Sequence, residues 1–370
     1  MRLLDRYVLT EMVLPFVTGV LAIIIMLVGN TLFQIVDLIL KNNIPLGMVA
    51  KLIVFNVPSL VVLTLPVGTA ISAAFVVNRL ARESELTALR MSGIPLRRIF
   101  APIFLVGALV SAGSFLLGEH VVPAAERAFQ RTQADMFGYA IASSPELISN
   151  RVFTFQNYAF YVQQAAPIDS RHPNTLQVQG VTIIQDAASP GGFARIITAR
   201  SALYDRGLWR LRGVIFHSFD SAGFTSVETT AQTATLDLRA PIPLIDPDQS
   251  AGFAGTSDNL DMAQLSRQIS LLRRTGQNPT KLEVDYQFKM SLPLLCLAFA
   301  LCAPPLALRF ARAGSFMGIF LSIVMVFVAW NTLLLTKAFG VSGHLDPILA
   351  AWSPDLLFAL AGVALLRAAE

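Results

Sequence analysis

The sequence contains few charged residues and only two cysteines. Charged residues make up 14% of the 370 residues and hydrophobic residues 54%, and the mean hydropathy is +0.60. This balance leaves too little polar surface for an ordinary soluble protein. Cys296 and Cys302 stand six residues apart in one apolar segment, a spacing that does not place them on one helix face. We therefore expect no disulfide, and we expect both thiols to pack rather than to bind metal.

The sequence also lacks the motifs of common catalytic sites. It has no Gly-Lys pair, which excludes the phosphate-binding loop of P-loop NTPases, and it has neither His-Glu-x-x-His nor Gly-x-Ser-x-Gly. The histidines are scattered, and none has another at metal-ligand spacing: His120, His172, His217 and His344. A Ser/Lys or Asp/Asp pair within the membrane is disfavoured because intramembrane charges are so few. We therefore expect no active site, metal or cofactor in this chain.

Six long apolar runs dominate the sequence instead, in two groups of three. Each holds roughly 20 residues or more, the length that a helix needs to cross a bilayer. The predicted spans are Met12–Val36, Leu52–Asn78, Ile99–Gly118, Met290–Leu308, Ala313–Thr336 and Pro347–Leu366. Asp355 interrupts the last run, so we expect it near the aqueous end or facing protein. The chain is therefore predicted to be an α-helical membrane protein with six spans, 3+3, around a large polar insertion.

Basic residues are distributed unevenly over the short loops. If the N-terminus is inside, the inner segments hold Arg2, Arg6, Arg79, Arg82, Arg90, Arg97, Arg98, Arg309, Arg312 and Arg367. The short outer loops hold Lys41, Lys51 and Lys337. Because positive charge favours the cytoplasmic side, we expect both termini inside and the insertion outside. The first run is too long for a signal-peptide core and no small-residue cleavage site follows it, so we expect an uncleaved helix.

The insertion is predicted to be an all-β domain over residues 123–260, between membrane segments 1–122 and 281–370. After Glu119 the hydrophobic period changes from helical to alternating, and turn residues separate segments rich in Val, Ile, Thr and aromatic residues. The expected strands are Arg151–Gln163, Leu176–Gln185, Ala194–Tyr204, Leu208–Phe219 and Thr225–Leu238. No helix of crossover length interrupts them, so we expect an antiparallel sandwich or jellyroll.

An amphipathic helix is predicted within residues 261–280, just before the fourth span. From Asp261 to Thr275, four apolar residues share one face, and Gly276 and Pro279 end the helix. These apolar residues are Met262, Leu265, Ile269 and Leu272. We expect this helix at the outer membrane surface or packed beneath the β-domain, with Arg273 and Arg274 near the lipid headgroups.

The inner loop Arg79–Arg98 is the most informative polar segment. It predicts a short helix from Leu80 to Met91, which ends at Gly93, with Pro95 opening the next element. One interpretation is a solvated loop whose arginines meet lipid phosphates. The other is a coupling helix that inserts into a cytoplasmic partner through a carboxylate. Composition alone favours the solvated loop, because surface charge pairs are common and individually weak.

Several motifs resemble one known family. Leu65-Pro66 and the segment Arg82–Ile94 (RESELTALRMSGI) closely resemble the stretch between the second and third helices of the lipopolysaccharide export permeases, LptF/LptG. Further similarity lies in Leu4–Tyr7 (LDRY), in Gly118–Pro123 (GEHVVP), in the pre-membrane helix with Gly276, and from Glu283 through Lys289 to Pro293. The resemblance covers most of the chain apart from the β-rich part, where only the pattern is similar.

The resemblance implies a subunit of a larger exporter. Family members have six membrane helices and a periplasmic β-jellyroll, pair as a heterodimer with a paralogous subunit in the bacterial inner membrane, and are driven by a cytoplasmic ABC ATPase dimer. They extract lipopolysaccharide and pass it to periplasmic jellyroll bridge proteins of the LptC/LptA type. ATP is then bound by the partner, which fits the missing P-loop. The glutamate that engages the ATPase corresponds to Glu85, with Glu83 a weaker candidate and Arg82 and Arg90 beside them.

Lipid contacts and gate residues follow less directly from the resemblance. The family often places a basic side chain on the outer half of the first helix, but here that stretch reads Thr31–Asp37 (TLFQIVD), and Lys41 remains at its outer end. Lys41 and Lys289 are predicted either to bind headgroup phosphates or to anchor helix ends by snorkelling. Gly314 and Gly318 form a small-xxx-small motif in a gate helix. The β-domain interior, either ordinary core or an acyl-chain slide, is predicted to include Phe153, Phe155, Tyr161 and Val178.

The leading hypothesis is therefore a non-catalytic permease subunit for lipopolysaccharide export. Two alternatives are an ABC-type mechanotransmission subunit, which relays ATP hydrolysis without moving lipid, and a membrane protein that modifies envelope lipids. Lipid crosslinking separates the first alternative from export, and activity without an ATPase would indicate the second.

Overall fold

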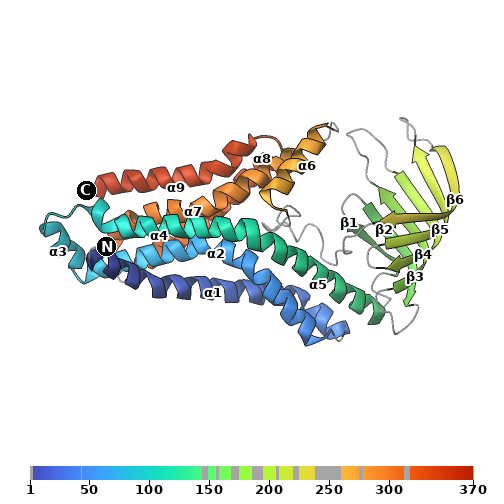
Figure 1. The fold of residues 1–370 in the computed structure, drawn as a ribbon, viewed down its shortest axis with the longest axis horizontal. Coiled ribbons are helices and arrows are strands. Elements are labelled where there is room, and N and C mark those ends of the chain that lie inside the picture. Colours follow the sequence, from blue (N-terminus) through green and yellow to red (C-terminus); the bar gives the residue numbers. More distant parts are fainter. Residues whose placement is uncertain are drawn as a thin grey trace. The chain divides into compact units, whose positions relative to one another are not determined.

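The computed structural model describes residues 3–42, 44–143, 149–155, 158–167, 175–185, 195–205, 208–219, 225–237, 260–274, 278–311 and 317–369. Its helices are α1 (Leu3–Asn42), α2 (Leu46–Arg82), α3 (Glu85–Met91), α4 (Leu96–Leu116), the π-helical turn η1 (Leu117–Val121), α5 (Val122–Ser143), α6 (Met262–Arg274), α7 (Thr280–Phe310), α8 (Met317–Val341) and α9 (Pro347–Ala369). The strands are β1 (Arg151–Phe155), β2 (Tyr158–Pro167), β3 (Thr175–Gln185), β4 (Arg195–Asp205), β5 (Leu208–Phe219) and β6 (Thr225–Asp237) (Figure 1).

Six helices among the described residues are long and apolar enough to cross a membrane, which confirms the predicted spans. The qualifying segments are Leu3–Phe33, Leu46–Arg82, Leu96–Gln133, Thr280–Phe310, Phe320–Val341 and Pro347–Ala369. Most of these helices are longer than the apolar runs, because polar residues at a helix end can reach the membrane–water interface and the helix can continue there. The chain divides into two compact units, one of residues 1–30, 56–125 and 256–370, and the other of residues 31–55 and 126–255.

In the first unit, α7 packs against α4, α8 and α9. Two glycines let the backbones approach closely. A Cβ placed on Gly107 of α4 would lie 2.3 Å from the Cβ of Ala300 in α7, and one on Gly362 of α9 would lie 2.8 Å from the carbonyl of Leu301. Membrane helices use small residues in this way because lipid offers no hydrophobic drive for helix association. The α4–α7 contact therefore forms a seam between the first three spans and the last three.

One carboxylate and two thiol side chains of the last three spans face this protein interior. Asp355 of α9 is 7% exposed, so it faces protein as expected, and among the described residues neither carboxylate oxygen has a hydrogen-bond partner. Cys296 and Cys302 are free thiols buried in α7. Both cysteines therefore pack in the interior, although they are not on one helix face.

The segment after the third span differs from the prediction. A single π turn, η1, follows α4, and α5 then continues as a helix to Ser143, whereas the β-domain was expected from residue 123. The sequence of α5 is rich in Ala and contains Gln and Arg, which favour a helix but lack the hydrophobicity of a membrane run. In the second unit, α5 packs through Met136 against Ile35, Ile44, Val49 and Leu52. The strands accordingly begin at Arg151.

The six described strands form one antiparallel sheet in the order β1-β2-β3-β4-β5-β6. The predicted strand Arg151–Gln163 is instead two strands, because Phe155 pairs with Tyr158 and the chain reverses between them. No Gly or Pro marks that reversal, which is why the pattern looked continuous. An inserted antiparallel sheet is therefore confirmed, and closure into a sandwich or jellyroll stays a prediction.

One face of the sheet carries an apolar core. Val178 is buried there as predicted, beside Phe160 and Trp209, whose rings stack at 5.3 Å. Tyr161 was predicted in the core, but it alternates to the other face and its hydroxyl donates to Asn150 Oδ1 at 2.8 Å. The side chains of Phe153 and Phe155 lie outside the described residues.

A line of irregular residues crosses the sheet without changing its register. The ladders are interrupted at Gln163, Gly180, Arg200, Gly213 and Gln232, which lie opposite one another on successive strands. Gly180 and Gly213 have positive φ, 62° and 63°. On each strand, the alternation between core-facing and outward-facing side chains is offset by one residue across this line. One apolar core therefore continues along the whole sheet.

Candidate functional site

The loop between the second and third spans, which the basic residues predict to lie inside, contains a separate short helix. The helix was predicted to run unbroken from Leu80 to Met91, but α2 ends at Arg82 and α3 begins at Glu85. Ser84 between them has a left-handed backbone with φ 60°, which breaks the helix. The other boundary is as predicted, because Gly93 has φ 81° and its N–H donates to the Arg90 carbonyl at 2.9 Å.

The α3 helix has one apolar side that packs on the protein. Leu86 is 3% exposed and Leu96, at the start of α4, is 1% exposed. The charged side chains of this loop therefore lie on the remaining faces of α3 and at its two flanks.

Glu85, the predicted contact to an ATPase, has a partner on α1. The hydroxyl of Tyr7 donates a hydrogen bond to Glu85 Oε1 at 3.2 Å, and the Glu85 residue is half-buried. The second carboxylate oxygen leaves acceptor capacity for another donor, since an ionised carboxylate accepts several hydrogen bonds. Tyr7 therefore holds this carboxylate in one orientation without using all its capacity.

Both flanks of the loop are also bonded to the first turns of α1. The guanidinium of Arg98 in α4 donates to both oxygens of Asp5, at 2.8 and 3.0 Å. Arg79 near the end of α2 pairs with Glu11 of α1 and, at 3.1 Å, with Glu83. Bidentate arginine–carboxylate pairs fix geometry as well as charge. The start of α1 thus joins both ends of the loop and its central helix; we call these contacts the inner clasp.

The other predicted coupling residues lie at the surface. Arg82 is exposed, and Glu83 is exposed beside Arg79. Arg90 is exposed and donates to the carbonyl of Ala369 at 3.4 Å. The part that these residues take in ATPase binding stays a prediction. Sequence reasoning missed Asp5, Tyr7 and Glu11, although the motif LDRY had been noticed as a point of resemblance.

The lipid-headgroup candidates are placed differently from one another. The ammonium of Lys289 lies 3.5 Å from Glu119 and donates to the carbonyl of Leu260 at 2.5 Å, so it has partners inside the protein. Arg274 is exposed at the end of α6. The side chain of Lys41 lies outside the described residues. Their contacts with lipid remain predictions.

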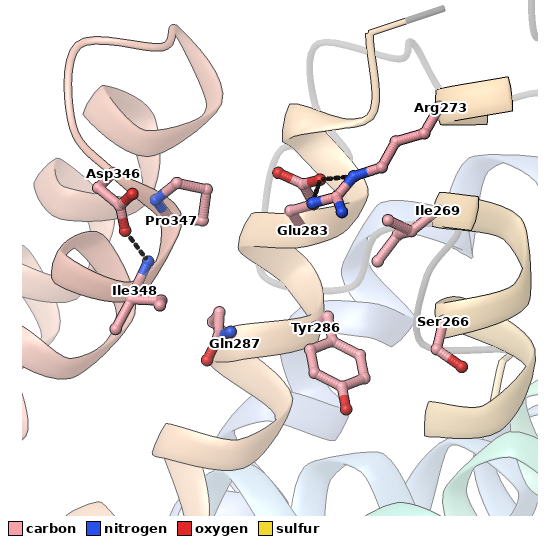
Figure 2. A pocket seen from close by; sticks show the side chains of 9 residues that line it. All are labelled: Ser266, Ile269, Arg273, Glu283, Tyr286, Gln287, Asp346, Pro347 and Ile348. Carbon is pink, nitrogen blue, oxygen red and sulfur yellow. Dashed lines mark hydrogen bonds and ion pairs between the residues drawn. The ribbon is translucent and has the colours of Figure 1, made fainter. Parts of the chain in front are cut away.

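Arg273 lies at the mouth of a pocket between α6, α7 and the start of α9 (Figure 2). The pocket has a volume of about 350 Å³. Arg273 reaches Glu283 at 2.6 Å, and its side chain is 67% exposed. Asp346 accepts from the N–H of Ile348 at 2.8 Å on the far side. The remaining lining residues are Ser266, Ile269, Tyr286, Gln287 and Pro347. The helix predicted before the fourth span is confirmed as α6, with Leu265 buried.

A second hollow, of about 290 Å³, lies in the unit that contains α5. Lys51 of α2 and Arg131 of α5 line it together with Asp135, and Met48 and Phe55 supply apolar surface. Sequence reasoning had named Lys51 only as an outer-loop charge and had not named Arg131. Their convergence depends on α5 being a helix, which the sequence pattern had not indicated.

The predicted packing motif of the fifth span is described in part. A Cβ on Gly318 would lie 3.1 Å from the Cβ of Asn78 in α2, so a side chain there would crowd that helix. Gly314 lies outside the described residues. The close approach at Gly318 agrees with a packing role.

The described residues bring together charged contacts rather than a reactive centre. No group of three His, Cys, Asp or Glu side chains among them is placed to hold a metal ion. A comparison with curated proteins finds no match. A family model described as lipopolysaccharide export system permease LptF/LptG matches residues 6–368, essentially the whole chain. With six membrane-span helices and an inserted antiparallel sheet, the chain belongs to the LptF/LptG family of lipopolysaccharide export permeases.

Proposed function

We propose that this chain is a non-catalytic subunit of an ABC-type lipopolysaccharide exporter, and that a separate cytoplasmic ATPase dimer engages it at α3. The observation that carries the proposal is the family match over residues 6–368 together with the inner clasp. Glu85 is half-buried but keeps acceptor capacity, and the loop that bears it is tied to three membrane helices. A push on α3 would therefore reach α1, α2 and α4 together.

The proposed orientation follows the basic loops. Both termini and α3 lie in the cytoplasm, and the strands lie in the periplasm, because arginines concentrate at the ends of helices on the α3 side. Cysteine labelling of Thr87 and of Thr230 in intact cells tests this arrangement. Only Thr230 should react with an impermeant reagent, and labelling of Thr87 would contradict the orientation.

Partners are proposed from exposed apolar surface. The helices α1 and α8 carry many large exposed hydrophobic residues, among them Leu14, Ile25, Phe320 and Phe327. In a bilayer such faces meet lipid or another membrane helix. We assign them to a cavity shared with a paralogous subunit, from which lipopolysaccharide would leave toward a periplasmic jellyroll bridge. The apolar core face of the sheet supports an acyl-chain route as well as ordinary packing.

The decisive experiment is capture of the ATPase by Glu85 variants. Glu85→Ala should weaken co-purification of the ATPase by roughly tenfold or more, because a charge-assisted contact is lost, and Glu85→Lys should weaken it further through repulsion. Thr87→Ala on the same helix is the matched control, since Thr87 is exposed. Unchanged capture and transport in both Glu85 variants would refute the role of Glu85.

A second measurement separates export from a relay that moves no lipid. Photo-reactive residues at exposed positions of α1 and on the apolar face of the sheet should form lipid adducts that accumulate with ATP. Adducts absent from both regions, in a complex that still hydrolyses ATP, would favour mechanotransmission.

A further inference from the structure

A compact group of polar contacts lies just beyond the apolar runs of the third and fourth spans, at the end away from α3. Glu119 occupies the middle of η1, and Lys289 lies on α7. Glu119 Oε2 lies 3.5 Å from the Lys289 ammonium, while Glu119 Oε1 accepts the N–H of Met262 at 2.9 Å. Lys289 in turn donates to the carbonyl of Leu260. The two side chains are 18% and 16% exposed, so this is a mostly buried pair; we call it the outer clasp.

The outer clasp lies where the chain leaves the membrane spans and where it returns. The outgoing chain runs from η1 directly into α5 and then to the strands. The returning chain reaches the spans at Leu260–Met262 and continues into α6. Glu119 and Lys289 therefore bond the exit point, the return point and α7 to one another.

Both the exit point at η1 and the return point at the start of α6 have distinctive backbone structure. A π turn is rare and frequently lies at a functional site, and its extra residue changes the direction of the side chains that follow. At the start of α6, Asp261 and Gln264 cap each other, with Gln264 N–H donating to Asp261 Oδ1 at 2.7 Å. The Met262 N–H is one of the first-turn donors that a helix cannot satisfy itself, and Glu119 accepts it.

The chemistry of the clasp favours a positioning role over a stabilising one. Burying a carboxylate and an ammonium costs desolvation that their attraction barely repays, and an apolar pair of similar size often serves stability as well. An apolar pair, however, accepts no N–H from Met262 and donates nothing to Leu260. The ionic pair therefore specifies where the returning chain is held.

We propose that Glu119 and Lys289 are positioning residues that fix the returning chain and α6 to the third and fourth spans, so that movement of these spans reaches the strand-bearing segment. The part played in transport rests on the proposed export function, whereas the anchoring of α6 does not. The control site is Ser270 on the same helix, which is exposed and whose hydroxyl donates only to the Arg267 carbonyl of α6 itself.

The test compares three proteins in nanodiscs, each as the full chain with its partner subunits. They are the parent, the apolar double variant Glu119→Leu/Lys289→Met, and the control Ser270→Ala. Hydrogen exchange is followed at the amides of residues 262–265, thermal stability is recorded, and lipid delivery to a purified periplasmic acceptor is measured per ATP hydrolysed.

In the double variant we expect exchange at residues 262–265 to be at least about tenfold faster, with exchange in α7 and thermal stability unchanged. Lipid delivery should fall roughly tenfold while ATP hydrolysis stays within about twofold, since the α3 contact is intact. The Ser270→Ala control should match the parent in each measurement.

Parent-like exchange in the double variant would overturn the anchoring. Faster exchange with undiminished lipid delivery would overturn its role in transport. If the parent complex hydrolyses ATP without delivering lipid, the proposed export function fails, and the exchange comparison still decides whether the clasp anchors α6.

Discussion

Moving one methyl group across the α4–α7 seam tests whether this contact holds the two groups of spans together. In Gly107→Ala, the new Cβ would lie 2.3 Å from the Cβ of Ala300, which is fully buried. Carbon atoms prefer about 3.5–4.0 Å, so the helices would have to separate by more than about 1 Å. In Ala300→Gly the obstructing methyl is absent. The double variant then places a methyl on α4 where α7 formerly supplied one.

The expected energies follow from overpacking and helix propensity. Overpacking costs about 1–3 kcal/mol, and an overlap this severe belongs at the upper end, while Ala in place of Gly returns about 1 kcal/mol. We therefore expect Gly107→Ala to lose about 2 kcal/mol. Ala300→Gly loses one buried methyl, about 0.8 kcal/mol, and about 1 kcal/mol of helix propensity. In the double variant these terms nearly cancel, so the loss should be under about 1 kcal/mol, against about 4 kcal/mol for additive effects.

Equilibrium unfolding of the purified protein in mixed detergent micelles measures these free energies. Gly113→Ala is the control on the same helix, because a Cβ there meets nothing within 4 Å. It should be neutral or slightly stabilising. Additive losses in the double variant would show that Gly107 and Ala300 are not in contact and would refute the seam.

Three further predictions concern the inner clasp and the sheet. Asp5→Asn or Arg98→Gln should reduce ATP-driven lipid delivery more than it reduces ATPase capture. The swapped pair Asp5→Arg/Arg98→Asp should recover part of the lipid delivery. An equal loss of capture and delivery would contradict transmission through this ion pair. Tyr7→Phe should weaken ATPase capture by about 2- to 10-fold, the value of one hydrogen bond that orients Glu85, and unchanged affinity in a titration would show that Tyr7 does not orient it. Gly213→Ala should destabilise the sheet by about 1–2 kcal/mol because φ is positive there, so limited proteolysis between the strands should accelerate; a parent-like digestion rate would argue against that backbone conformation.

The membrane topology was predictable from sequence because a bilayer imposes a length of apolar chain on every span. The helix α5 was not, since its Ala, Gln and Arg residues resemble neither a membrane run nor a strand. The break at Ser84 was also hidden, because a serine with positive φ has no signal in sequence and depends on its surroundings. An antiparallel sheet was predicted, but the reversal after Phe155 carries neither Gly nor Pro, so the two strands looked like one.

The candidate site was predictable only where its residues are neighbours in sequence. Glu83 and Glu85 stand out within one charged loop, whereas Asp5 and Tyr7 lie far from it in the chain and meet it through folding. Glu119 and Lys289 are a comparable case at the other end of the spans. Pairs of this kind need the register between helices, and hydrophobic periodicity does not give that register.

The position of α1 depends on contacts near its inner end. Within residues 3–30, which are all described, the fully buried side chains are Val8 and Met12, and the clasp residues Asp5, Tyr7 and Glu11 lie in the same turns. Only 17% of the most apolar window of α1 is buried, compared with 67% for α7. Lipid is as apolar as the exposed side chains of α1, so it supplies no force that holds this helix against the protein. Helix α1 also packs on α2, where a Cβ on Gly68 would lie 2.4 Å from a methyl of Val20. Polar contacts to the α3 loop add to this packing in placing α1, and displacement of that loop should move α1 more than it moves α7.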